Sequence, residues 1–208
     1  SGTGTIEVHA GRVFDFGLAL TMGDADGDVL DAADYSIQTT EGAITITATD
    51  DVNLDSVNAD SDGANAAGTV TVTADSDSSG VGAIVDSLGT EAANVTGGAA
   101  VFTAATGIGS AGDIDTRVGT LAFSNTTSGN VAIDSAITVL INDVGALTTS
   151  SNAGTGTTSV TSAGGITFAH NTSSVGNLTA TTTDTASTNT ENIVVNGSVT
   201  VTSSGGDV

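Results

Sequence analysis

The chain has 208 residues, of which 28 are glycine and none is proline, cysteine or tryptophan, and its formal net charge is −22. Binding to a nucleic-acid backbone or an anionic membrane surface requires lysine and arginine, so a chain with two such residues is expected to bind neither. The lack of cysteine excludes disulfides and thiolate chemistry, and no apolar stretch approaches the roughly 20 residues of a membrane span, so no membrane insertion is expected.

The N-terminal residues 5–8 are already strand-like, and no basic or apolar leader pattern precedes them. At the other end, residues 203–208 have the composition of a turn that leads into another strand. We therefore expect the chain to start and stop inside a repeating pattern. It would then be a piece of a longer protein or a unit that stacks end to end.

Residues 1–41 are expected to be an irregular or capping N-terminal part, and they contain the densest acidic cluster. Four carboxylates at close spacing could supply oxygen ligands to calcium, namely Asp24, Asp26, Asp28 and Asp31. The cluster does not follow the EF-hand pattern: counted from Asp24, the sixth position is Val29 instead of glycine and the twelfth is Tyr35 instead of glutamate. Two interpretations stay open, a calcium site and a solvated acidic loop. Calcium is the one cofactor that the sequence suggests.

A short pattern recurs from residue 42 onward, in which a glycine precedes β-forming residues at alternate positions. It occurs as GAITITA from Gly42, GTVTVTA from Gly68, GTLAFSN from Gly119 and GSVTVTS from Gly197. Similar stretches follow the glycines at positions 98, 145, 165 and 176, and further strands are expected at residues 51–54, 129–133, 137–141 and 192–195. No segment has a convincing helical pattern.

Recurrence at this spacing predicts an all-β chain folded as a parallel β-helix, or β-solenoid, over residues 1–208, with regular coils over residues 42–208. Roughly eight coils at about 4.8 Å per coil would make a rod about 40 Å long. Val, Ile, Leu and Ala are expected to face inward in ladders, and Thr, Ser and Asp to face outward.

Two stretches resemble the repeats of large bacterial exoproteins of the filamentous-haemagglutinin type. They are GAITITATDDVNLDSV from Gly42 and the segment from Thr103 to Asp134, and the resemblance extends over about Val29 to Val208. It implies a right-handed parallel β-helix shaft that is secreted to the cell surface and used in adhesion, biofilm formation or contact with other cells.

Several motifs could indicate enzyme chemistry, but each has a structural explanation. The glycines Gly107, Gly109 and Gly112 form a GxGxxG pattern, yet the residues that follow favour a strand-to-strand turn over the helix that a dinucleotide site needs. The two histidines, His9 and His170, each lie next to a strand-like stretch, where a solvent-facing or capping imidazole is expected, and no Gly-x-Ser-x-Gly pattern occurs.

Two further patterns bear on other activities. The paired carboxylates Asp50 with Asp51 and Asp113 with Asp115 could serve a polysaccharide lyase or glycosidase, but the chain has few aromatic rings to stack on sugars. Thr-x-Thr pairs such as Thr45 with Thr47 could form an ice-binding array, which would require a constant coil length that the glycine spacing does not provide.

These observations predict a non-enzymatic structural or adhesive protein, either the shaft or a filament-forming part of an extracellular or cell-surface bacterial adhesin. The alternative is a calcium-stabilised sheath or filament subunit without an adhesive target, and a polysaccharide-degrading β-helix enzyme ranks below both. The expected partners are neighbouring coils, identical subunits end to end and a cell-surface or glycan target.

Overall fold

The computed structural model describes residues 6–10, 36–63, 67–88, 90–109, 112–183 and 191–208. Every regular element in these ranges is a β-strand, and none of their residues forms a helix that could cross a membrane. The strands are β1 (Ile6–Ala10), β2 (Ser36–Gln38), β3 (Ile44–Ala48), β4 (Val52–Leu54), β5 (Ser56–Asn58), β6 (Thr69–Thr73), β7 (Ile84–Asp86), β8 (Val95–Ala104), β9 (Ile114–Asn125), β10 (Val131–Ser135), β11 (Val139–Ile141), β12 (Ser150–Asn152), β13 (Thr158–Ser162), β14 (Ile166–Phe168), β15 (Thr172–Ser174), β16 (Leu178–Thr182), β17 (Ile193–Val195) and β18 (Val201–Ser203).

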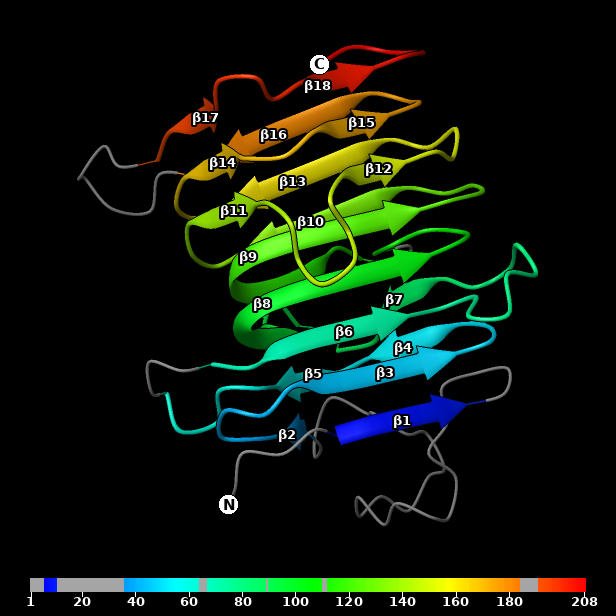
Figure 1. The fold of residues 1–208 in the computed structure, drawn as a ribbon, viewed down its shortest axis with the longest axis vertical. Coiled ribbons are helices and arrows are strands. Elements are labelled where there is room, and N and C mark those ends of the chain that lie inside the picture. The colour runs from blue at the N-terminus through cyan, green and yellow to red at the C-terminus, as the bar shows by residue number, and fades with distance from the viewer. Residues whose placement is uncertain (1–5, 11–35, 64–66, 89, 110–111, 184–190) are drawn as a thin grey trace.

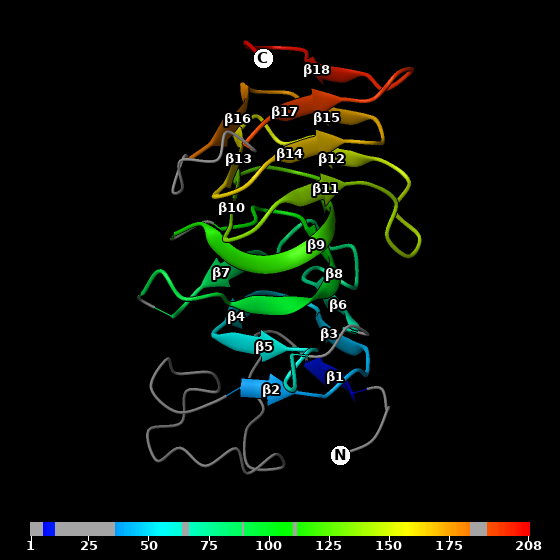
Figure 2. The ribbon, with the colours of Figure 1, turned by 90° about the vertical axis from the view of Figure 1, so that its left-hand side faces the viewer.

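The named strands pair in parallel with strands that precede or follow them along the chain. Ile44 of β3 is in register with Val70 of β6, which is in register with Ala100 of β8. Sixteen strands form one sheet in this way, and β4 and β7 form a second, two-stranded sheet. The strands are stacked from β1 and β2 at one end to β16, β17 and β18 at the other (Figures 1 and 2). This all-β, parallel arrangement agrees with the β-solenoid expected from the glycine-led repeats.

The core is a column of inward-facing side chains that runs along the stack. Buried and half-buried residues alternate in β3 and β6, as β-strands with one covered face require. One in-register row of this column contains Ile44, Val70, Ala100, Leu121, Ile141 and Phe168, all 0–2% exposed. Each apolar side chain is thus covered by its counterparts in the strands on either side, which is how a solenoid excludes water without a globular core.

The two longest strands, β8 and β9, bend and contribute to two faces of the stack (Figure 2). The start of β8 pairs with β5, and the remainder pairs with β6. The start of β9 pairs with β10, and its second half pairs with β11 and then β12. The chain between β11 and β12 folds over the outer face of β8 and β9, where Val144 and Leu147 pack on Val101 and Ala122 (Figure 1).

Several of the recurring glycines are required because two backbones approach closely. A Cβ atom on Gly68 would collide with the carbonyl oxygen of Gly42, and one on Gly176 would collide with that of Gly156. Neither glycine has a positive φ angle, so contact with the preceding backbone, and not turn geometry, excludes a side chain here.

The strand positions agree with the sequence for the most apolar repeats and differ elsewhere. Gly98 and Gly119 lie inside β8 and β9 and do not precede them. Gly145 does not begin a strand: it lies in a turn, with φ +59°, between Val144 and Leu147, which form an antiparallel bridge. The polar strands β12 and β15 were not expected at all.

The inward ladders are only partly apolar, which corrects the expectation that Ser and Thr face outward. Buried polar side chains continue the column in the C-terminal half and comprise Ser135, Ser150, Asn152, Thr158, Ser162, Thr172 and Ser174. They satisfy one another, as when Thr158 Oγ1 donates to Ser174 Oγ at 2.9 Å. A polar core is stable when its donors and acceptors are paired in this way.

Candidate functional site

Five carboxylates gather on one side of the stack around the start of β9. Glu91, Asp113 and Asp115 each place a carboxylate oxygen within 4.8 Å of the other two. Asp134 of β10 is in register with Asp115, and Asp86 ends β7. We call these five residues the acidic cluster.

Asn94, which is fully buried, positions two members of the acidic cluster. Its Nδ2 donates to Asp86 Oδ1 at 2.6 Å, and its Oδ1 accepts the backbone N–H of Asp115 at 2.8 Å. The same Nδ2 lies 3.1 Å from the carbonyl oxygens of Leu54 and Asp55. One buried amide therefore links β4, β7 and β9 directly beneath the cluster.

The proximity of like charges changes the acidity of two carboxylates. Burial, together with the charges of Asp113, Glu91, Asp134 and Asp86, raises the pKa of Asp115 to about 7. Burial, with Asp113 and Glu91, also raises the pKa of Asp134. Protonation of the acidic cluster is therefore favoured near neutral pH, which lowers its negative charge.

Convergent carboxylate oxygens of this kind could be ligands for a hard divalent cation such as calcium. Glu91 is exposed, and Asp113 and Asp115 are half-buried, so the cluster is open to solvent. Clusters of acidic groups are common on a chain with 24 acidic residues. The three carboxylates Glu91, Asp113 and Asp115 are close enough together to hold a cation.

A second chemical arrangement joins Ser150, His170 and Asp143. Ser150 Oγ lies 2.8 Å from His170 Nε2, and His170 Nδ1 lies 3.1 Å from Asp143 Oδ1. This is the order of groups found in serine hydrolases. The sequence did not predict it, because the three residues lie in separate segments and no nucleophile motif marks Ser150.

Burial argues against hydrolysis by this Ser150–His170–Asp143 chain. Ser150 is 1% exposed, and its Oγ also accepts the backbone N–H of Phe123 at 3.2 Å, whereas the Asp143 side chain is 58% exposed. A hydrolase needs the reverse, an accessible hydroxyl and a buried acid. His170 is 6% exposed, so of the two alternatives expected for it, a solvent-facing or a capping imidazole, the solvent-facing one is wrong. Its ring joins Ser150 of β12 to Asp143 in the loop after β11.

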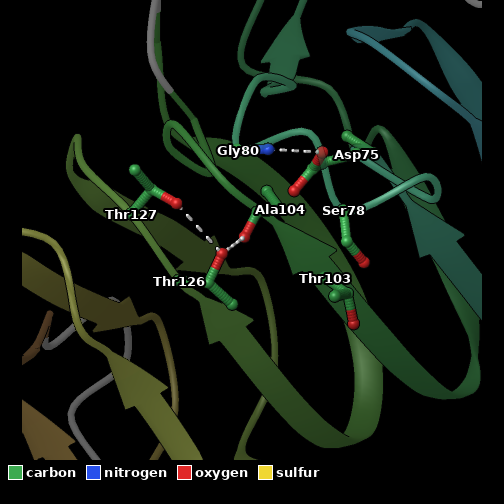
Figure 3. Close-up of a pocket in the computed structure, with 8 residues that line it drawn as sticks. Asp75, Ser78, Gly80, Thr103, Ala104, Thr126 and Thr127 are labelled. Atoms are coloured by element: carbon green, nitrogen blue, oxygen red, sulfur yellow. Dashed lines mark hydrogen bonds between the residues drawn. The ribbon is translucent and has the colours of Figure 1, made fainter.

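A hollow of about 320 Å³ lies beside the loop after β6 (Figure 3). It is lined by Ala74, Asp75, Ser78, Gly80, Thr103, Ala104, Thr126 and Thr127. Its one carboxylate is used within its own loop, because Asp75 Oδ1 accepts the Ser79 hydroxyl at 2.9 Å and the Gly80 N–H at 3.0 Å. The hollow therefore offers hydroxyl groups but neither a base nor a cation.

The structure also bears on two other motifs expected from the sequence, the calcium ligands and the GxGxxG glycines. Asp24, Asp26, Asp28 and Asp31, the expected calcium ligands, lie outside the described residues. Gly107 and Gly109 have φ angles of 135° and 73°, and the next element is strand β9, so the strand-to-strand turn is confirmed and the dinucleotide motif is excluded.

The sequence had paired Asp113 with Asp115, and the structure adds Glu91, Asp86 and Asp134 to them. Asp134 could have been found from the repeat, since it occupies the register position of Asp115 in the next parallel strand. Glu91 lies between β7 and β8 outside any strand, so no periodic signal marks it.

Comparisons with protein-family models, with curated proteins and with solved structures find no match for this chain. The functional argument therefore depends on the geometry described above.

Proposed function

We propose that this chain is the shaft or a filament-forming part of an extracellular bacterial surface adhesin, built as a right-handed parallel β-helix of roughly eight coils, and that it is not an enzyme. The observation that carries the proposal is the single ladder of parallel strands whose core column continues from β3 to β14. Strands stacked in this way form an elongated structure with extended, regular side surfaces.

One general rule and one observation support the handedness and the coil number of this architecture. Connections between parallel strands of one sheet are right-handed in about 98% of cases, which favours a right-handed coil. The path from β1 through β3, β6, β8, β9, β10 and β13 to β16 passes through eight strands of the described sheet, which favours roughly eight coils.

The non-enzymatic assignment is supported by the placement of the aromatic rings and the buried nucleophile. Phe102, Phe123 and Phe168, the aromatic residues in the described part of the chain, are 0–2% exposed and cannot stack on a sugar. The Ser150 hydroxyl, which is paired with the His170 ring, is inaccessible. The surface role and location are supported by the resemblance to filamentous-haemagglutinin-type repeats and by the solvated acidic surface.

Negative-stain electron microscopy of the purified chain over a concentration series tests this proposal. We expect straight particles of constant width, either isolated rods or longer filaments. Compact particles without a long axis would overturn it. Binding of labelled rods to cells or to immobilised glycans then separates an adhesin from a purely structural layer, because only an adhesin needs a target other than itself.

A calcium-stabilised sheath or filament subunit is the second candidate, and the acidic cluster is the observation that favours it. The same microscopy with calcium and then with excess chelator distinguishes the two. Loss of filaments in chelator would favour the sheath subunit, and unchanged particles would favour the calcium-independent shaft.

A further inference from the structure

The hollow beside the loop after β6 lies between the turns of three consecutive coils (Figure 3). These turns are residues 74–83 after β6, residues 105–107 after β8 and residues 126–130 after β9. They end at three residues that are in register, namely Ile84, Ile108 and Val131. The middle turn is the shortest and stays close to the stack, because the Ala105 N–H donates to the Gly82 carbonyl at 2.9 Å. The hollow is therefore the space that this short turn leaves between two longer ones.

Polar groups from all three coils face this space. Asp75 and Ser78 lie on one side, Thr126 and Thr127 on the other, and Thr103 between them (Figure 3). Asp75 Oδ1 is bonded within its own loop. In the described part of the chain, no group bonds to Asp75 Oδ2 or to the hydroxyls of Ser78 and Thr103. These three groups are thus available to a molecule in the hollow.

The loop that carries Asp75 and Ser78 has a strained backbone. Their φ angles are 60° and 59°, and among the described non-glycine residues only Ser198 shares a positive value. The loop is nevertheless fixed, because Asp75 Oδ1 accepts the Ser79 hydroxyl and the Gly80 N–H. Strained residues that are held in one shape concentrate at ligand-binding positions. The strain is therefore a second observation, independent of the hollow, that marks this loop as a binding element.

The chemistry of the lining selects a neutral ligand that carries hydroxyl groups. A phosphate, sulfate or carboxylate group would need a cation, and no lysine or arginine is among the described residues that line the hollow. The Asp75 carboxylate and the net charge of −22 repel such anions further. Each threonine presents a methyl group beside its hydroxyl, and a sugar ring presents the same mixture of C–H and O–H groups.

The size of the hollow agrees with a single sugar ring. Its volume of about 320 Å³ is at the lower end of the range for ligand pockets, about 300–1,000 Å³. We propose that the hollow binds one neutral sugar ring of a glycan, with Asp75 Oδ2 accepting hydrogen bonds from sugar hydroxyls and with the hydroxyls of Ser78 and Thr103 binding others. This inference rests on the proposed adhesin and names the chemical class of its target.

Hydrogen bonds provide the affinity of this site, because no aromatic ring is among the described residues that line it. A few neutral hydrogen bonds give binding in the millimolar range. Many rods on one surface would present many such sites to a glycan-covered surface, which raises the overall affinity without any new contact. Weak single sites are therefore compatible with adhesion.

NMR titration of the isotope-labelled full chain with methyl glycosides of glucose, galactose, mannose and N-acetylglucosamine tests the site. We expect saturable shifts confined to the amides around residues 74–80, 103–104 and 126–127. Glucuronic acid and N-acetylneuraminic acid should bind at least about tenfold more weakly, because the Asp75 carboxylate repels theirs. The absence of saturable shifts with all four glycosides would overturn the inference, as would equal binding of the acidic sugars.

Thr103→Val removes one hydroxyl from the hollow and keeps the shape and strand preference of the side chain. We expect roughly fivefold weaker binding of the neutral glycosides, as for the loss of one hydrogen bond. Thr47→Val is the matched control, because Thr47 is half-buried in the same outward row and does not line the hollow. Equal affinities of the two variants, with unchanged circular dichroism spectra, would refute the site.

Asp75→Asn tests the selection by charge. The amide oxygen can still accept the Ser79 and Gly80 donors, so the loop keeps its hydrogen bonds. We expect the discrimination between neutral and acidic sugars to fall below about threefold, which a purely structural role of Asp75 would not cause. Discrimination equal to that of the wild type would contradict the proposed recognition.

Titration in calcium and then in excess chelator distinguishes direct recognition from binding through a cation. Sugar binding should be the same in both, and binding that requires calcium would overturn the inference. Straight rods that bind cells but none of the four glycosides would leave the proposed adhesin intact and refute only the hollow as its site. Compact particles would refute the shaft itself.

Discussion

Asp115 lies beside Asp134 and within the acidic cluster, and its pKa of about 7 exceeds the ordinary value of 3.8. Between these two values the folded chain binds more protons than the unfolded chain at this group. The free energy of unfolding therefore falls as the pH rises from about 4 to about 7. Because the carboxylate is partly solvated, screening limits the effect to about 1 kcal/mol.

Asp115→Asn should remove this pH dependence. We expect the variant to gain about 1 kcal/mol of stability over the wild type at pH 8 and little at pH 4, where the wild-type carboxyl is protonated. Urea unfolding at the two pH values measures the difference. Asp207→Asn removes one charge from an exposed position and serves as the control. A gain for Asp115→Asn that is the same at both pH values would contradict the explanation.

Within the elements, polar side chains take over the inward positions of β12, β13 and β15, and Asn152 is the clearest example. Its Oδ1 accepts Asn125 Nδ2 at 2.9 Å and the Gly154 N–H at 3.2 Å, and its Nδ2 donates to the Thr157 carbonyl at 3.2 Å. Asn125 and Asn152 are 0% and 1% exposed. The two amides thus form a buried hydrogen-bonded pair between β9 and β12.

Asn152→Ala should destabilise the chain by about 3 kcal/mol, since several buried donors and acceptors lose their partner at once. Ser151→Ala, the adjacent half-buried residue of the same strand, should change stability by less than about 0.5 kcal/mol. Chemical unfolding of both variants provides the comparison. A similar small loss for both would show that the amide pair contributes little.

The polar rows also explain which elements sequence reasoning could predict. Strands β3 and β6 follow an apolar alternation that identifies them directly. Strands β12 and β15 have the sequences SSN and TSS, which look like turns. Part of their inward polarity is satisfied by residues 16 or more positions away, such as Asn125 for Asn152, His170 for Ser150 and Thr158 for Ser174. The repeat locates Asp134 beside Asp115, but Glu91 enters the acidic cluster from a segment without periodicity.

For the whole molecule, a ladder in which each strand contacts only its neighbours makes stability depend on position along the stack. Strands β8 and β9 lie in the middle, pair on both sides and contain the fully buried Phe102 and Phe123. Strands β17 and β18 pair on one side only among the described residues, and the three residues of β17 are all exposed. Opening of the terminal strands therefore costs less free energy than opening of the central ones.

Hydrogen exchange measured by mass spectrometry on monomeric rods at low salt should detect this gradient. We expect amides of β17 and β18 to exchange at least about tenfold faster than those of β8 and β9, which corresponds to a difference of about 1.4 kcal/mol in opening free energy. Uniform protection along the monomer would instead mean that the stacked strands unfold as one cooperative unit and would contradict the gradient.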